Sequence, residues 1–223
     1  MLRRLLTISL LAGLAAGVLA TLVQSALLTP LILEAELYEG GSAPAHDHGA
    51  ATAAHEHEHA GMDLERFAFT LMANLLAGVG FALLLNAAVT LRGGTLTARA
   101  GVLWGLAGFA AFALAPALGL PPELPGSEAA DLAARQLWWL GTAAATAGGL
   151  ALAAFGRSRA LQAAGIVLLA LPHVFGAPAP EKLGGSAPPE LAAHFAVLSL
   201  FAAALFWAAL GGLSGLLQER RTA

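Results

Sequence analysis

The sequence predicts an all-α, polytopic integral membrane protein whose spans form a six-helix transmembrane bundle. Composition gives the first indication: hydrophobic residues make up 58% of the chain and charged residues only 11%, whereas a soluble domain carries about 25% charged residues. Run length gives the second, because a spanning helix needs roughly 20 mostly apolar residues. The candidate spans are residues 5–33, 67–91, 101–120, 137–155, 160–175 and 191–217.

Only α-helices and closed β-barrels satisfy all backbone hydrogen bonds in lipid. These runs predict helices because they are continuously apolar, whereas barrel strands alternate apolar and polar residues. The first run follows Arg3 and Arg4, as in a signal peptide. It continues to residue 33, well past the usual apolar region of a signal peptide, so we expect an uncleaved span. The run at 160–175 is the shortest. We expect residues 1–223 to form a single transmembrane domain.

The charges predict that both termini are cytoplasmic, because basic residues flank spans on that side. Eight basic residues fall on the side of the termini: Arg3, Arg4, Arg92, Arg99, Arg157, Arg159, Arg220 and Arg221. The other side holds three: Arg66, Arg135 and Lys182. It also holds thirteen of the fourteen acids, so the outer face sums to 3 − 13 = −10 and the inner face to 8 − 1 = +7. An acidic outer face attracts cations.

The first outer loop, residues 40–61, is rich in histidine and lies on the periplasmic side in this topology. Imidazole beside carboxylate is a ligand set for Co²⁺, Ni²⁺ and Zn²⁺. The candidate ligands are His46, Asp47, His48, His55, Glu56, His57, Glu58 and His59. Their alternation predicts several weak, exchangeable sites in a flexible segment; the alternative is a solvated, pH-sensitive linker. The chain has no cysteine, which argues against Cu⁺.

Polar side chains inside the spans predict where a cation would pass. Gln24 and Asn74 lie at similar depths on the first two spans, given the helical rise per residue. Polar groups at bilayer depth usually face the interior or a cavity. We therefore predict that both supply oxygens to a polar path; helix capping and interhelical hydrogen bonding are the alternative.

A second group of side chains lies near the outer helix ends, where we predict an entry site for a divalent metal ion. Its members are Glu36, Glu39, Glu123, His173, Glu190 and His194. Glu190 and His194 share one helix face at a spacing of four residues. An intramembrane zinc enzyme using His173, Glu190 and His194 is an alternative, but it needs three fixed ligands. No H-E-x-x-H motif is present, and we predict no enzymatic activity.

Several segments together resemble one family. They are Gln24 with Pro30-Leu-Ile-Leu-Glu-Ala-Glu36-Leu-Tyr-Glu39, Gly119-Leu-Pro-Pro-Glu-Leu-Pro-Gly126, Arg135-Gln136-Leu-Trp138-Trp139, Pro172-His173-Val-Phe-Gly-Ala-Pro178 and His194-Phe195. In this order the chain is similar, over essentially its whole length, to the CbtA family of predicted cobalt transporter subunits. The resemblance implies a multi-pass protein of the bacterial inner (cytoplasmic) membrane that acts in cobalt uptake linked to cobalamin biosynthesis. It also implies a small single-span partner, CbtB, and five spans, where the charges favour six.

The sequence therefore predicts uptake of a divalent transition metal, with Co²⁺ as cargo and Ni²⁺ and Zn²⁺ as open alternatives. No fixed cofactor and no nucleic-acid partner is expected. A metal-sensing or metal-delivery subunit without a pore is the main alternative. Three motifs, Gly13-x-x-x-Gly17, Gly101-x-x-x-Gly105 and Gly211-x-x-x-Gly215, permit close helix contact. They allow a homo-oligomer, although we favour packing within one chain.

Overall fold

The computed structural model describes residues 2–40, 64–182 and 184–220, and within them the chain is helical, with no strand. In chain order the elements are α1 (Leu2–Leu27), α2 (Thr29–Gly40), α3 (Leu64–Arg92), α4 (Ala98–Phe109), the π-helical turn η1 (Ala110–Leu114), α5 (Ala115–Ala117), α6 (Leu132–Phe155), α7 (Arg159–Phe175) and α8 (Pro189–Glu219). The predicted all-α fold is confirmed.

Five helical segments are long and apolar enough to cross a membrane. They are α1, α3, the continuous segment Ala98–Ala117 formed by α4, η1 and α5, α6, and α8. The remaining predicted run forms α7, whose 17 residues extend about 25 Å and reach only the lower limit for a span. A membrane protein with several apolar helices is thus established. The sixth span stays a prediction.

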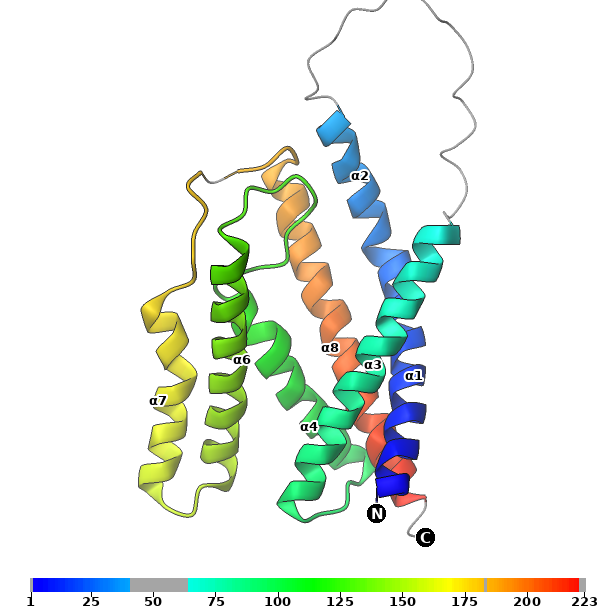
Figure 1. Ribbon diagram of the computed structural model, residues 1–223, viewed down its shortest axis with the longest axis vertical. Helices are drawn as coiled ribbons and strands as arrows, with labels where there is room; N and C mark the ends of the chain where they lie inside the picture. Colours follow the sequence, from blue (N-terminus) through cyan, green and yellow to red (C-terminus); the bar gives the residue numbers. More distant parts are fainter. Residues whose placement is uncertain (1, 41–63, 183, 221–223) are drawn as a thin grey trace, which may run out of the picture.

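The helices run alternately up and down one long axis, and both chain termini lie at the same end (Figure 1). We call this the termini end. The short connections between α3 and α4 and between α6 and α7 also lie there. The opposite end, which we call the loop end, carries the connections between α5 and α6 and between α7 and α8. The basic residues that flank the helices, such as Arg3, Arg92 and Arg157, therefore gather at the termini end.

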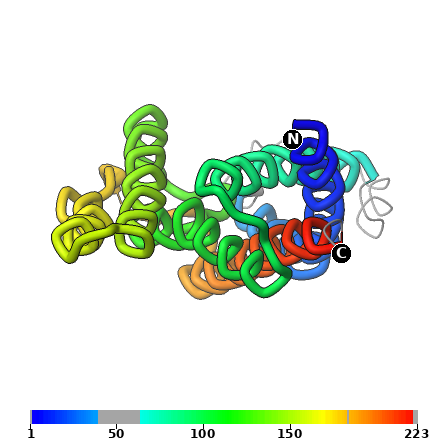
Figure 2. Tube along the Cα trace, turned by 90° about the horizontal axis from the view of Figure 1, so that it is seen from below, coloured from blue at the N-terminus to red at the C-terminus, as the bar shows by residue number. Residues whose placement is uncertain are grey.

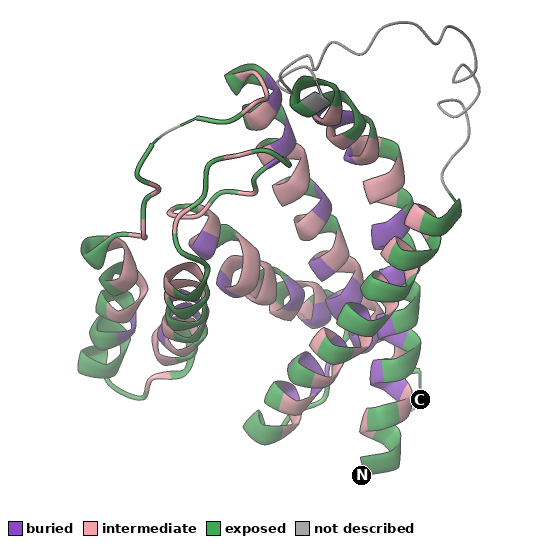
Figure 3. Cartoon of the chain, turned by 45° about the horizontal axis from the view of Figure 1, so that its top comes forward, coloured by how far each residue is buried: buried purple, intermediate pink, exposed green. Residues whose placement is uncertain are grey.

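The core forms where α1, α3, α4 and α8 meet, and most buried residues lie there (Figure 3). Glycines bring the backbones into contact. A Cβ placed on Gly13 of α1 would lie 2.6 Å from the Val79 Cα of α3. The pairing of α4 with α8 uses the same device, since a Cβ on Gly101 or Gly105 would strike the α8 backbone. These motifs pack helices within one chain, as we favoured.

The hairpin of α6 and α7 stands to one side of this core (Figure 2). Among the described elements, α7 contacts only α6. The two helices meet at Gly149 and Gly165, where a Cβ on Gly165 would lie 2.6 Å from the Gly149 carbonyl oxygen. In the described chain the backbones of α6 and α8 do not approach each other. The hairpin packs on the core mainly through the segment from α4 to α5, and Arg92 of α3 also lies over the Phe155 ring of α6 at 4.2 Å.

Two prolines coincide with irregularities in the helices. Leu28 separates α1 from α2, just before Pro30, which lacks the N–H that would continue the helical ladder. The π-helical turn η1 precedes the fully buried Pro116. Proline and π-bulges are the usual causes of helix kinks, and π-bulges often mark functional sites.

At the loop end, the proline-rich loop after α5 is anchored in two ways. Leu124 is 3% exposed and packs with Leu31, Leu191 and Phe195. An isolated antiparallel bridge joins Ser127 to Gly185 of the loop between α7 and α8. The loop is thereby fixed over the ends of α2 and α8, and it sets the position of the acidic residues described below.

Candidate metal path

Two predicted path residues contact each other across α1 and α3. Asn74 Nδ2 donates hydrogen bonds to Gln24 Oε1 at 2.8 Å and to Thr21 Oγ1 at 3.1 Å. Thr21 is 1% exposed, and its hydroxyl donates in turn to the Gly17 carbonyl oxygen at 3.0 Å. We call Thr21, Gln24 and Asn74 the outer amide cluster. It gathers amide and hydroxyl oxygens, which coordinate hard and borderline cations.

A second group, the inner amide cluster, lies nearer the termini end and consists of Ser9, Asn86, Ser214 and Gln218. Asn86 Nδ2 donates to Ser9 Oγ at 3.1 Å, to Ser214 Oγ at 3.2 Å and to the Ala82 carbonyl oxygen at 2.9 Å. Gln218 Nε2 donates to Asn86 Oδ1 at 2.9 Å. Asn86 is 2% exposed and both serines are fully buried. The cluster thus joins α1, α3 and α8.

The sequence marks Asn86 as a polar residue deep in its span, but it did not predict the inner cluster that forms around it. Its signal was a hydroxyl placed within a face of small residues: Ser9 precedes Ala12 and Gly13, and Ser214 lies between Gly211 and Gly215. A serine at such a position on an apolar helix enters the interface and meets the neighbouring helices.

Small and apolar residues separate the two clusters. Asn74 and Asn86 are twelve residues apart on α3, or about 18 Å along the helix. Between them α1 and α3 are in backbone contact at Gly13, Gly17 and Gly78. On the α8 side the space holds a buried apolar group: Ala16, Ala82, Leu85, Trp207 and Leu210. This arrangement closes the route between the clusters.

A cavity of about 770 Å³ lies below the inner cluster and is bounded by the termini-end segments of α1, α3 and α8. Asn86, Thr90 and Gln218 contribute polar groups to its wall, and Arg4 lies at it too. Arg4 Nη2 donates to the Gln218 carbonyl oxygen at 3.2 Å. We call this the termini-end cavity. It brings the buried inner cluster within reach of one end of the molecule.

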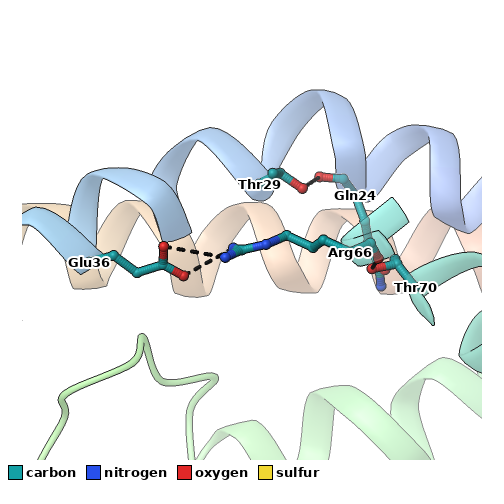
Figure 4. Close-up of polar contacts among 5 residues, drawn as sticks. All are labelled: Gln24, Thr29, Glu36, Arg66 and Thr70. Carbon is teal, nitrogen blue, oxygen red and sulfur yellow. Dashed lines mark hydrogen bonds and ion pairs between the residues drawn. The ribbon is translucent and has the colours of Figure 1, made fainter. Parts of the chain in front are cut away.

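The predicted entry-site carboxylates on α2 lie at the loop end, each with a neighbour. Glu36 receives two hydrogen bonds from the guanidinium of Arg66, at 3.0 and 3.3 Å (Figure 4). Arg66 belongs to α3, so the pair ties the outer arm α2 to α3. Glu39 lies against the loop after α5, where a Cβ on Gly126 would come within 2.5 Å of Glu39 Oε1. Glu36 and Glu39 therefore face different partners.

Glu123 is also paired with an arginine, because Arg135 Nη2 lies 2.6 Å from Glu123 Oε2. The pair lies at a second cavity of about 770 Å³, between α6 and α8, which we call the lateral cavity. Its wall is mostly apolar and includes Phe112, Trp139 and Leu200. Glu36 and Glu123, both proposed as metal ligands, thus carry a basic countercharge in this structure.

The two predicted histidines lie on helices that do not touch. His173, near the end of α7, contacts the Trp138 ring edge-on at 6.1 Å, whereas His194 is exposed on α8 beside the exposed Glu190. Figure 1 shows that α2 and α8 extend beyond the loop-end terminus of α7. The described chain holds no group of three His, Asp or Glu side chains able to bind a metal. The zinc-enzyme alternative therefore has no three-ligand site there.

The histidine-rich ligands at 46–59 lie outside the described residues, so metal binding by this loop stays a prediction. Of the remaining predicted residues, Gln24 and Asn74 contact each other. The acids and histidines are dispersed over the loop end.

Helices of this length and hydropathy, with amides buried between them, define the class of protein: a polytopic, membrane-embedded α-helical protein. The model of one family, described as "Probable cobalt transporter subunit (CbtA)", matches residues 2–219. The chain belongs to the CbtA family. No curated protein and no solved structure matches it.

Proposed function

We propose that this protein passes Co²⁺ inward across the bacterial inner membrane along the interface of α1 and α3. One observation carries the proposal: the two amide clusters lie one above the other on these helices, in a family described as a cobalt transporter subunit. Buried polar groups inside spanning helices commonly mark ion pathways. A transporter subunit is also the non-enzymatic role that the family suggests.

The proposed orientation places the termini end in the cytoplasm and the loop end in the periplasm. Its support is the arginine distribution, since basic residues such as Arg4, Arg92 and Arg157 lie at the termini end. A divalent ion moving inward then gains about 4.6 kcal/mol per 100 mV, twice the value for a single charge. The membrane potential alone could thus drive accumulation.

At the loop end we propose an approach zone rather than one closed site. The ligands at 46–59 capture cations, and the acids and histidines around the helix ends pass them on: Glu36, Glu39, Glu123, His173, Glu190 and His194. Their dispersal supports weak, exchangeable binding, which suits rapid delivery to the outer amide cluster. The acidic balance of this face raises the local cation concentration.

The word subunit in the family description implies a partner, and we propose CbtB, a small single-span protein, in that role. Neutral imidazole and oxygen ligands suit Co²⁺, Ni²⁺ and Zn²⁺ alike, so selectivity must come from geometry and supply. The main alternative remains a subunit that binds or delivers metal without a pore. It is favoured by the apolar closure between the two amide clusters.

Uptake into right-side-out vesicles, with and without co-expressed CbtB, separates these functions. An imposed inside-negative potential should drive Co²⁺ accumulation above that of vesicles lacking the protein, and excess Ni²⁺ or Zn²⁺ should reveal the preferred ion. The double variant His173→Gln, His194→Gln should raise the half-saturating Co²⁺ concentration. Stoichiometric Co²⁺ binding without accumulation in either preparation would establish the non-pore function instead.

A further inference from the structure

We propose that Ser9, Asn86, Ser214 and Gln218 form a second cation site, from which a partly hydrated divalent ion is released into the termini-end cavity. This inference rests on the proposed function and adds to it a release site and a conformational state. The outer amide cluster receives the ion, and the inner cluster releases it. In the structure Asn86 and Gln218 line the termini-end cavity, whereas apolar side chains and glycine contacts separate the inner cluster from the outer one.

The first observation is the burial of the inner cluster. An amide buried between spanning helices is costly unless it is hydrogen-bonded. Asn86 donates to two serine hydroxyls and one carbonyl, and it accepts from Gln218. Side-chain groups of α1, α3 and α8 therefore converge on one amide. If the network served only to join the helices, it would need no cavity beside it.

The second observation is that this core is not closed. Asn86 and Gln218 both line the termini-end cavity, together with Thr90. Its volume of about 770 Å³ far exceeds the roughly 10–15 Å³ that one water molecule needs by the same measure. An ion at Asn86 can therefore keep part of its hydration shell while the side chains supply the other ligands.

The chemistry of the cluster indicates weak binding. Its ligand atoms are neutral oxygens: two hydroxyls and two amide carbonyls. Rotation of the Asn86 amide by half a turn directs Oδ1 at Ser9 and Ser214, whose hydroxyls turn freely to present their lone pairs. The guanidinium of Arg4, bonded to the Gln218 carbonyl, lies at the same cavity and lowers cation affinity further. Weak binding suits an exit, because an ion must leave as readily as it enters.

The third observation is the closure between the two clusters. Leu85 and Leu210 fill the interface on one side, and the contact of Gly13 with Gly78 closes the other. Backbones that touch at glycines have no interlocking side chains there, so α1 can slide along α3 by a small shear. Such a shift opens the closure toward the outer cluster without breaking the helices.

The absence of cysteine from the sequence makes single-cysteine labelling a direct test. Thr90→Cys places a thiol at the termini-end cavity, and Thr70→Cys places one a helical turn beyond the outer cluster. A membrane-impermeant maleimide is applied to inside-out vesicles for the first and to right-side-out vesicles for the second. Co²⁺ should slow the labelling of each thiol at least threefold.

Asn86→Leu then separates the two sites. We expect it to abolish Co²⁺ protection at Thr90→Cys, to retain protection at Thr70→Cys, and to lower Co²⁺ flux at least tenfold. Ser214→Ala, a smaller change that keeps the helix packing, should reduce protection at Thr90→Cys about twofold to threefold. Thr142→Val, which removes a buried hydroxyl of α6 outside both clusters, is the matched control and should leave protection and flux unchanged.

Four outcomes overturn the inference. Protection at Thr90→Cys that survives both Asn86→Leu and Ser214→Ala, with unchanged flux, would make the inner cluster purely structural. Labelling of Thr90→Cys only from the outside would reverse the direction. If the two single-cysteine proteins show neither flux nor protection of their thiols, the proposed function fails and the release site fails with it. Normal flux in these proteins that Asn86→Leu leaves unaffected removes the release site alone.

Discussion

Asn74 of α3 donates a 2.8 Å hydrogen bond to Gln24 of α1, one turn before the helix breaks at Leu28. The Gln24 carbonyl oxygen accepts from Leu28 N at 2.8 Å. It also accepts from Thr29 Oγ1 at 3.4 Å (Figure 4). Gln24 thus binds the Asn74 amide of α3 through its side chain. Through its backbone carbonyl it binds Thr29, the first residue of α2. A change in ligation at this amide can therefore be transmitted to α2.

Asn74→Leu and Gln24→Leu should each lower the maximal rate of Co²⁺ uptake at least tenfold, because each removes an oxygen from the outer amide cluster. The loss of stability should be small, about 1 kcal/mol, since hydrogen bonds between membrane helices are weak. Vesicle uptake and thermal unfolding in detergent measure the two effects. Thr70→Val, one turn away on α3, is the control and should change neither. Normal uptake by both leucine variants would exclude this cluster from the path.

The proximity of Gln24 and Asn74 could be predicted because the helical rise is regular. Counting residues from the ends of two adjacent spans placed Gln24 and Asn74 at one depth. The inner cluster could not be predicted in this way, because it requires α1 to pack on α8. No local pattern reports contact between the first and last helices of a chain.

The arginine partners of the loop-end carboxylates could not be predicted from the sequence. Glu36 and Glu123 read as metal ligands because carboxylates suit that role, yet Arg66 and Arg135 pair with them. Arg66 follows Glu36 by thirty residues, across the histidine-rich segment. Rules based on residue spacing along one helix cannot predict contacts between residues so far apart in the sequence. For the same reason they could not predict that α7 and α8 lie apart.

Gly78→Ala and Gly80→Ala should have opposite effects on stability, although they lie two residues apart on α3. A Cβ on Gly78 would strike the Gly13 carbonyl oxygen, whereas a Cβ on Gly80 would have nothing within 4 Å. Overpacking should cost about 1–3 kcal/mol at Gly78, and the better helix propensity of alanine should add about 0.5–1 kcal/mol at Gly80. Thermal unfolding in detergent compares them. Equal stability of the two variants would show that α1 and α3 do not touch there.

A reporter fused after Ala223 should read cytoplasmic, and one inserted at residues 40–61 should read periplasmic. The reason is the concentration of arginines at the termini end. A third fusion after Gly176 tests α7, the shortest of the six candidate spans, and should read periplasmic if α7 crosses the membrane. A cytoplasmic signal after Gly176 together with a periplasmic one after Ala223 would establish five spans and leave α7 outside the bilayer.

Deletion of residues 46–59 should raise the Co²⁺ concentration needed for half-maximal uptake and leave uptake at saturating Co²⁺ largely intact. A tethered set of weak ligands raises the local ion concentration without forming the path. A variant that replaces the five histidines of this segment by glutamine keeps its length and serves as the comparison. Loss of uptake at every Co²⁺ concentration, with normal membrane insertion, would place the loop in the translocation site.

Arg66→Gln should lower the half-saturating Co²⁺ concentration about threefold, because it removes the guanidinium that pairs with the Glu36 carboxylate. The size follows from the exposure of the pair: Arg66 and Glu36 are 40% and 38% exposed, and such pairs contribute about 0.2–1 kcal/mol. Arg66→Lys, which keeps the charge, is the control and should leave the half-saturating concentration near that of the parent. The effect of Arg66→Gln should shrink as ionic strength rises.

A double-mutant cycle shows whether this effect runs through the carboxylate. Glu36→Gln alone should raise the half-saturating concentration, and adding Arg66→Gln should then change it little, because the arginine has lost the group it competes for. If Arg66→Gln lowers the concentration by the same factor in both backgrounds, the arginine acts only through the overall charge of the outer face. Glu36 would then not be a ligand on the approach, and the parallel pair of Glu123 and Arg135 would be the next to test in the same cycle.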